Sequence, residues 1–217
     1  MPQNSQIKTA VLIFAYSPSE EMLHKAIPKA DDLYGELTEH TIKTVEKSGL
    51  SYFHFTEHEQ KGSSFGERFT TAIQAVFDLG FKNVITIGND SPQLKASQLI
   101  NASRHLDKRE FVLGPSMDGG FYLMGIHKSQ FDATKFQDLP WQTTKTAAAL
   151  LLLIQENNTP VVKLETLIDL DCVSDLKNFL LYSSKVPYVL TELVLCIIYG
   201  KILKFFRYPD VHLNLLI

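Results

Sequence analysis

Short apolar runs rich in β-branched residues alternate along the chain with longer stretches of helical periodicity, and this alternation constrains the fold more than any other feature. The clearest runs are residues 9–15, 51–56 and 84–87, and apolar residues at helical spacing follow each of them. Strands that alternate with helices are typical of βα units around a largely parallel sheet. The sequence therefore predicts an α/β fold.

One part of the pattern breaks the alternation. Two expected strands, residues 110–113 and 121–126, are separated by only the seven-residue connector 114–120. A connector of this length allows antiparallel pairing, whereas a parallel crossover needs about a dozen residues or more. We therefore predict a mixed sheet. A loop containing two prolines is expected between the first strand and the helix that follows it, at residues 16–30.

Length and charge exclude several classes of protein. The chain has 217 residues, 24 of them acidic and 21 basic, which suits one domain with an appendage. Because no domain-wide positive field exists, we expect no binding to nucleic acid. Cys172 and Cys196 lack metal-ligand spacing, so neither a disulfide framework nor a zinc site is expected. The N-terminal apolar run lacks the features of a signal peptide, which favours a cytoplasmic protein.

The C-terminal stretch 185–217 contains the most apolar part of the chain. Charged residues interrupt it, and its longest uncharged run is too short to span a bilayer. We expect a helical tail that packs on the domain or on a second copy of the chain as a homodimer. The alternative is a peripheral helix at the inner membrane, which the basic residues Lys201, Lys204 and Arg207 beside two phenylalanines favour.

Acidic residues follow the predicted strands at three places. Asn89 and Asp90 come directly after a buried strand, Asp118 lies in the short connector, and Asp169 and Asp171 follow the last predicted strand. Ligands of open α/β sheets bind beyond the carboxyl ends of the strands. Carboxylates that converge there repel one another unless a cation lies between them, which indicates magnesium or manganese. For any single residue of this set, a helix cap or a turn is the alternative.

Two common nucleotide-binding motifs are missing. The sequence contains no Gly-x-x-x-x-Gly-Lys-Ser/Thr segment and no Gly-x-Gly-x-x-Gly after the first strand, so P-loop ATP hydrolysis and dinucleotide redox chemistry lack their usual anchors. Gly88 and the pair Gly119 and Gly120 nevertheless supply backbone freedom beside the acidic loops, where a ligand can approach closely.

Four motifs, taken together and in order, resemble those of a glycosyltransferase-like family listed as domain of unknown function 2064. They are IGNDSPQL at 87–94, LGPSMDGGFYL at 113–123, LPWQTT at 139–144 and IDLD at 168–171. The segment FGER at 65–68 also matches a Gly-Glu-Arg segment of the family. The resemblance extends over roughly residues 8–182.

The resemblance implies a three-layer αβα fold of the GT-A, nucleotide-diphospho-sugar transferase type over residues 1–184, similar also to the guanylyltransferases of molybdenum cofactor assembly. It implies that Asp90 and Asp171 hold magnesium or manganese, and that Asp90 and Asp118 are the catalytic residues. The substrate-binding residues that it implies are Asn89, Gly119, Gly120, Trp141, Arg68 and Lys25. For Trp141 a place in the core is the alternative, and for Arg68 a place on a helix surface.

The function that the resemblance implies is a metal-dependent transferase that takes a sugar from a nucleoside diphosphate donor to a small-molecule acceptor. Asp118 would orient the acceptor hydroxyl or act as its base. A nucleotidyltransferase that releases pyrophosphate is the first alternative. A catalytically silent scaffold is the second, because residues 17–29 lack the glycine, threonine and arginine of the family's Pro-x-x-Gly-x-x-Lys-Thr-Arg segment and retain only Lys25 and Lys29 as cations.

Overall fold

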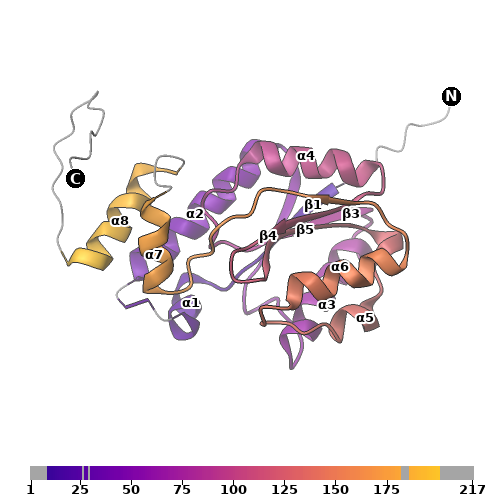
Figure 1. Cartoon of the computed structure of the whole chain (residues 1–217), viewed down its shortest axis with the longest axis horizontal. Helices are drawn as coiled ribbons and strands as arrows, with labels where there is room; N and C mark the ends of the chain where they lie inside the picture. Colours follow the sequence, from indigo (N-terminus) through magenta and orange to yellow (C-terminus); the bar gives the residue numbers. More distant parts are fainter. Residues whose placement is uncertain (1–8, 26, 29, 182–185, 201–217) are drawn as a thin grey trace.

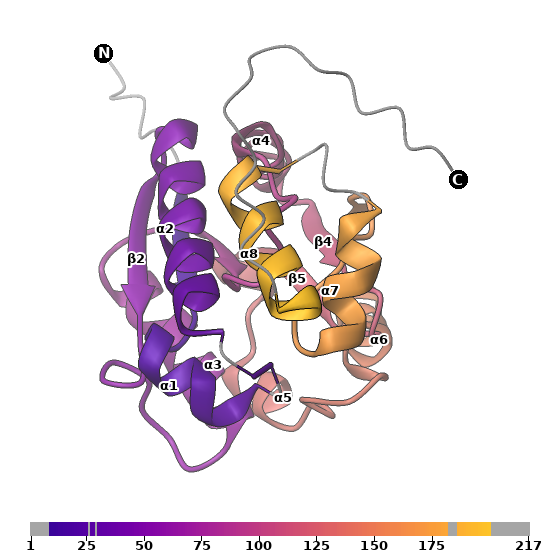
Figure 2. The same cartoon turned by 90° about the vertical axis from the view of Figure 1, so that its left-hand side faces the viewer.

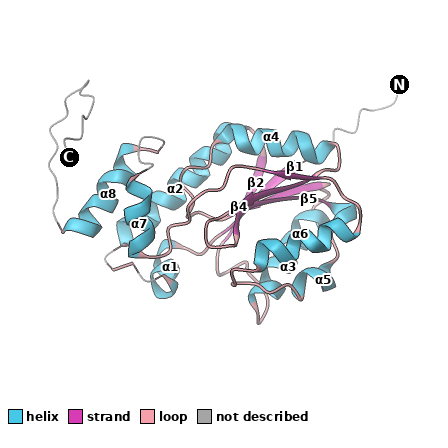
Figure 3. Ribbon diagram, viewed as in Figure 1, coloured by secondary structure: helices cyan, strands magenta, loops and turns pink. Residues whose placement is uncertain are grey.

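The computed structural model of the chain describes residues 9–25, 27–28, 30–181 and 186–200. One six-stranded sheet lies at the centre, with helices on both of its faces (Figure 1 and Figure 3). In chain order the strands are β1 (Thr9–Phe14), β2 (Ser51–Phe55), β3 (Asn83–Ile87), β4 (Phe111–Pro115), β5 (Phe121–His127) and β6 (Val161–Lys163).

The sheet is mixed, as predicted. Its strand order is β2-β1-β3-β5-β4-β6. β1 runs parallel to β2 and β3, and β4 runs parallel to β6, whereas β5 is antiparallel to both of its neighbours. The short connector between β4 and β5 explains the reversal, since it is too short for a crossover. Because the other strands share one direction, their carboxyl ends meet at one edge of the sheet.

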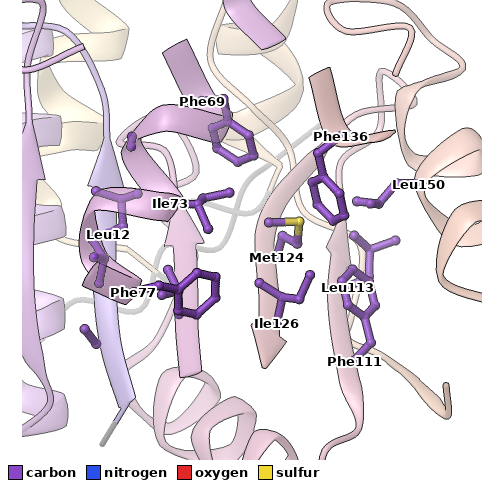
Figure 4. Close-up of a cluster of buried hydrophobic side chains, with 14 of the residues drawn as sticks. Leu12, Phe69, Ile73, Phe77, Phe111, Leu113, Met124, Ile126, Phe136 and Leu150 are labelled. Atoms are coloured by element: carbon purple, nitrogen blue, oxygen red, sulfur yellow. The ribbon is translucent and has the colours of Figure 1, made fainter. Parts of the chain in front are cut away.

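Helices on the two faces complete a three-layer arrangement. α2 (Asp31–Ser48) and α4 (Ala96–Asp107) cover one face, and α3 (Phe65–Asp78), α5 (Ala133–Gln137) and α6 (Thr146–Glu156) cover the other, where the 3-10 turn η1 (Lys128–Gln130) precedes α5. Figure 4 shows the second of these interfaces, where Phe69, Ile73 and Phe77 of α3 face the side chains of the sheet. The α/β, three-layer prediction is therefore confirmed.

The start of α3 shows how local sequence sets a boundary. The Ser64 side chain accepts a hydrogen bond from the Glu67 backbone N–H at 3.1 Å, which is half of the capping box that a Ser-x-x-Glu sequence favours. The Glu67 carboxylate accepts from the backbone N–H and hydroxyl of Ser63 instead, at 2.7 and 2.8 Å. The two side chains thus accept from the backbone N–H groups of Ser63 and Glu67 at the N-terminus of the helix.

The prediction of a loop between β1 and α2 was wrong for α1 (Pro18–His24). Ser17 caps this helix by accepting from the backbone N–H of Glu20 at 3.4 Å, and proline occupies its first position. Proline at the first helical position and acidic residues in the first turn both favour helix formation. Pro18 therefore starts a helix, and Lys25 is the C-cap residue at the end of that helix. Pro28 lies in a turn between α1 and α2, as expected for the loop.

The C-terminal helices pack on the part of α2 that extends past the sheet. α8 (Tyr188–Tyr199) lies between α2 and α7 (Val173–Leu180) in Figure 2, and Leu190 and Val194 of α8 are fully buried in the cluster that these helices form. The expected helix packed on the domain is thus observed over α8, whereas the boundary at residue 184 stays a prediction. The basic cluster at Lys201, Lys204 and Arg207 lies outside the described residues. Among the described helices none has the length and apolarity needed to cross a membrane.

Candidate active site

A cavity of about 550 Å³ opens at the carboxyl ends of β1 and β3. Two groups of side chains line it. The acidic cluster consists of Glu21, Asp90, Asp118, Asp169 and Asp171, together with Lys25, and the aromatic cluster consists of Phe14, Phe65, Phe69, Phe121 and Trp141. Both charged and apolar side chains therefore line the cavity, which suits a ligand that combines ionic and hydrophobic parts.

Backbone contacts bring Asp90 and Asp171 together although they are far apart in sequence. After β6, the chain continues along the end of β4, where the Leu167 N–H donates to the Pro115 carbonyl at 3.2 Å. It then reaches the loop after β3, and the Leu170 N–H donates to the carbonyl of Asp90 at 3.0 Å. The predicted convergence of acidic loops at this edge of the sheet is thus present.

Lys25 lies between the two converging carboxylates. Its Nζ is 2.8 Å from Asp90 Oδ2 and 2.9 Å from Asp171 Oδ1, and Glu21 Oε2 is 3.7 Å away. The Leu170 carbonyl accepts a further hydrogen bond from the ammonium at 3.5 Å. Only 12% of the Lys25 side chain is exposed. The position between the carboxylates, where a bridging cation is expected, is thus held by an ammonium group of the chain itself.

The charges of this cluster perturb one another. Burial alone would lower the pKa of Lys25, but Asp90, Asp171 and Glu21 raise it above its usual value and keep the side chain charged. Burial raises the pKa of Glu21 and of Asp171, and Lys25 opposes the rise at both carboxyls. Burial and the nearby charge of Asp90 raise the pKa of Asp169 to about 8. The carboxyl groups of the cluster therefore outnumber the single ammonium that faces them.

Hydrogen bonds within its own turn hold the Asp118 side chain in place. Its Oδ1 accepts hydrogen bonds from the Ser116 hydroxyl at 2.6 Å and from the Gly120 N–H at 2.8 Å. These contacts hold the carboxylate at the rim of the cavity, while Gly120 lines the cavity beside it. Gly119 adopts a φ of 92°, and a Cβ there would clash with the Thr144 carbonyl oxygen. The structure thus places Gly119 against the backbone of the 139–144 loop.

Trp141 both lines the cavity and packs in the aromatic cluster, so the two alternatives for this residue coexist. Its ring lies edge-on to Phe69, with centroids 5.0 Å apart, and tilted against Phe65 at 5.4 Å. Its indole N–H donates to the Phe136 carbonyl at 2.7 Å. These contacts fix the ring by packing and by one hydrogen bond, as is usual for a partly buried tryptophan.

Two other predicted substrate-binding residues have protein partners. Asn89 is buried and lines the cavity, but its amide donates to the Thr38 hydroxyl at 3.0 Å. Arg68 does not line the cavity. Its Nη2 donates to the Tyr16 hydroxyl at 3.2 Å, and Tyr16 stacks on His24 at the cavity wall. Lys29, the other cation of the altered segment, lies outside the described residues.

A Gly-x-Ser-x-Gly sequence at 62–66 invites comparison with serine hydrolases. In those enzymes the serine lies on a sharp turn between a strand and a helix. Here Ser64 has an extended backbone, with φ of −115° and ψ of 163°, and its hydroxyl caps α3. Its conformation is therefore that of a helix cap.

Glu21 and Asp169 are the acidic residues whose place the sequence predicts least well. Glu21 is buried and faces Lys25. The spacing of four residues on one helix is a signal for this pair. Asp169 accepts a short hydrogen bond from the Ser91 hydroxyl. No local signal indicates that bond, because the two residues come from different loops.

The carboxylates present suit a divalent cation in part. Oxygens of Asp90 and Asp171 already approach one cationic centre, and carboxylate oxygens are the ligands that magnesium and manganese prefer. Among the residues that the structure describes, no group of three or more histidine, cysteine, aspartate or glutamate side chains is arranged to hold a metal ion. Asp90 and Asp171 are thus two carboxylates close enough to share one cation.

Comparison with solved structures shows the same fold elsewhere. A proposed nucleotide-diphospho-sugar transferase from Desulfovibrio desulfuricans G20 superposes with a TM-score of 0.70 at 21% identity, over 88% of this chain and 97% of that one. Rv0371c from Mycobacterium tuberculosis H37Rv superposes with a TM-score of 0.50 at 12% identity, over 79% and 96%. No curated protein matches the chain. At these identities the likeness concerns the fold.

A family model matches the centre of the chain. The model is described as "Uncharacterized protein conserved in bacteria (DUF2064)" and covers residues 38–143. Asp90, Asp118 and Trp141 lie within this segment, whereas Lys25 and Asp171 lie outside it. The resemblance to DUF2064 that the motifs indicated is therefore confirmed, on a fold shared with a proposed nucleotide-diphospho-sugar transferase.

Proposed function

We propose that the protein is a transferase that takes a sugar from a nucleoside diphosphate donor and passes it to a small-molecule acceptor. One observation carries the proposal: Asp90 and Asp171 converge on a single cationic centre at the wall of a cavity of about 550 Å³. The fold shared with the D. desulfuricans protein, and that protein's description as a proposed nucleotide-diphospho-sugar transferase, support it.

In this proposal Asp90 and Asp171 hold a magnesium or manganese ion. The bound ion supplies a Lewis acid that offsets the charge of the leaving diphosphate. The backbone hydrogen bond between Leu170 and Asp90 holds together the two loops that carry the carboxylates. The hydrogen bond from the Asn89 amide to the Thr38 hydroxyl ties the loop after β3 to α2.

Asp118 is the proposed base or orienting group for the acceptor hydroxyl. Its position at the rim, fixed by Ser116 and Gly120, leaves it in contact with the cavity. A general base must reach the proton that it removes, and a carboxylate held by two donors has little freedom to turn away. Trp141 and its aromatic neighbours offer an apolar surface for a sugar ring or a base.

Thermal-shift measurements test the proposal. Unfolding would be followed with UDP, GDP, CDP and dTDP and with the matching triphosphates, each with and without manganese. A ligand at a hundredfold its dissociation constant adds about 2.7 kcal/mol to the free energy of unfolding, which raises the midpoint measurably. We expect a metal-dependent shift for at least one nucleoside diphosphate, its loss in Asp90→Asn, and its retention in Asp78→Asn, which changes an exposed carboxylate at the end of α3.

The released product separates the alternatives. A sugar transferase releases a nucleoside diphosphate, whereas a nucleotidyltransferase releases pyrophosphate from a triphosphate. Pyrophosphate release would replace the proposal by the second activity. The absence of any shift across the panel would contradict both and favour a catalytically silent scaffold.

A further inference from the structure

Lys25 is an unusual feature of this site, because it is a buried ammonium bound to the same carboxylates that the proposed metal would use. Both of its short contacts, at 2.8 and 2.9 Å, are to Asp90 and Asp171. Lys25 is also the C-cap of α1, where the backbone turns to an extended conformation with φ of −105° and ψ of 138°. Its side chain is thus anchored by a short helix at the cavity wall.

An ammonium and a divalent ion that bound these two carboxylates together would repel each other. A magnesium or manganese ion binds carboxylate oxygens at about 2.0–2.2 Å, shorter than the contacts that Lys25 makes. An ion bound to Asp90 Oδ2 and Asp171 Oδ1 would therefore lie close to Nζ and repel it. In this partly buried site the repulsion between the two cations is screened less than in bulk water. Occupation by the ion requires that the ammonium moves.

The charge balance favours the exchange. Glu21, Asp90 and Asp171 surround one positive charge, so the metal-free cluster has an excess of carboxylates. Lys25 reduces this repulsion only in part, whereas a divalent ion would offset two negative charges. The lysine stem is long and flexible, and Lys25 already lines the cavity into which it would turn.

We propose that Lys25 is a tethered counter-cation, which occupies the place between Asp90 and Asp171 in the metal-free protein and is displaced into the cavity when a divalent cation binds. The inference rests on the proposed function for the identity of the metal ligands. It adds a competition between a side chain and a metal, which sets the metal affinity of the site and places a positive charge in the cavity when the metal is bound.

Calorimetric titration of manganese alone tests the competition. Removal of the competing ammonium in Lys25→Met is expected to tighten manganese binding by about tenfold or more relative to the wild type. Lys43→Met is the matched control, because Lys43 also pairs with a carboxylate, Glu39, but on the exposed surface of α2. Its manganese affinity should equal that of the wild type. An unchanged or weaker affinity of Lys25→Met, or no binding by either protein, overturns the inference.

A second measurement uses the wild-type protein and remains decisive if Lys25→Met does not fold. Acylation of individual lysines by an amine-reactive ester would be followed by mass spectrometry, with the exposed Lys43 as the internal reference. Lys25 should be protected without metal and become severalfold more reactive when manganese is added. In Asp90→Asn it should lose part of its protection without any metal. Equal protection of Lys25 with and without bound manganese would refute displacement.

The two proposals can fail separately. Metal-dependent stabilisation by a nucleoside diphosphate, combined with equal manganese affinity of the wild type and Lys25→Met, would retain the transferase and reject the displacement. Tighter manganese binding by Lys25→Met without stabilisation by any nucleotide would retain the displacement and reject the transferase.

Discussion

The acidic and aromatic clusters line the same cavity but depend on different forces. The aromatic cluster joins α3, β5 and the 139–144 loop through ring contacts that also form part of the core on that face of the sheet. The acidic cluster joins α1 and the loops after β3 and β6 through charges and hydrogen bonds around Lys25. One cluster is stabilised by burial, and the other is held together against repulsion by a single cation.

This difference indicates that the acidic cluster contributes mainly to ligand binding and the aromatic cluster mainly to stability. Burial of aromatic rings favours folding, whereas an excess of buried carboxylates opposes it. Changes in the acidic cluster should therefore affect ligand binding and turnover strongly and have effects on stability that depend on the sign of the charge removed. Changes in the aromatic cluster should mainly lower stability. Four predictions test this division.

The largest effect is expected for Asp118→Asn. Asparagine can keep the hydrogen bonds from Ser116 and Gly120 but cannot act as a base, so turnover should fall by about 10²–10⁴-fold. Steady-state rates and the thermal shift by the donor would be measured together, with Asp78→Asn as the control. Loss of donor binding with an unchanged rate per bound donor would show that Asp118 binds the donor.

The stability of the acidic cluster should depend on the sign of the charge that is removed. Lys25→Met leaves the buried Glu21 and the partly exposed Asp90 and Asp171 without a counter-charge, and should lower the free energy of unfolding by about 3 kcal/mol, the lower end of the range for a broken buried pair. Asp171→Asn removes one of the excess carboxylates, about half of whose side chain is exposed, and should change it by less than about 1 kcal/mol. Urea unfolding in metal-free buffer measures both. Equal losses in the two variants would contradict the excess of negative charge.

Removal of a ring from the aromatic cluster should destabilise the protein without changing metal binding. Trp141→Ala is expected to lower the free energy of unfolding by about 3 kcal/mol, since the ring is partly buried and donates to the Phe136 carbonyl. Trp141→Phe keeps much of the packing and should lose less. The same preparations would be titrated with manganese. A change in manganese affinity in Trp141→Ala would show that the clusters are coupled.

The smallest effect concerns His40, which supports the loop that carries Asp90. His40 of α2 contacts the Pro92 carbonyl at 3.0 Å, and burial lowers its pKa below the usual value. The unfolded chain therefore takes up a proton more readily, and stability should decline as the pH falls through the usual histidine pKa of about 6.5. Unfolding midpoints between pH 8 and pH 5 would be compared with those of His40→Gln. An identical pH dependence in the variant would exclude this contribution.

The sequence predicted the elements of the fold for reasons that are local. Apolar periodicity separates strands from helices, and the short connector before Phe121 forces β5 to reverse. The error at α1 is also local, because a proline such as Pro18 indicates a loop but also suits the first position of a helix. Neither result required knowledge of distant parts of the chain.

The sequence by itself determined the class of the fold, the reversal of one strand, and the presence of acidic loops at strand ends, because each follows from the spacing of neighbouring residues. Only the tertiary structure decided which charges meet. Lys25 is 65 residues from Asp90, and the backbone bond between Leu170 and Asp90 sets the place of Asp171. Contacts of this kind depend on the paths of several loops over the core, and no local pattern of residues encodes those paths.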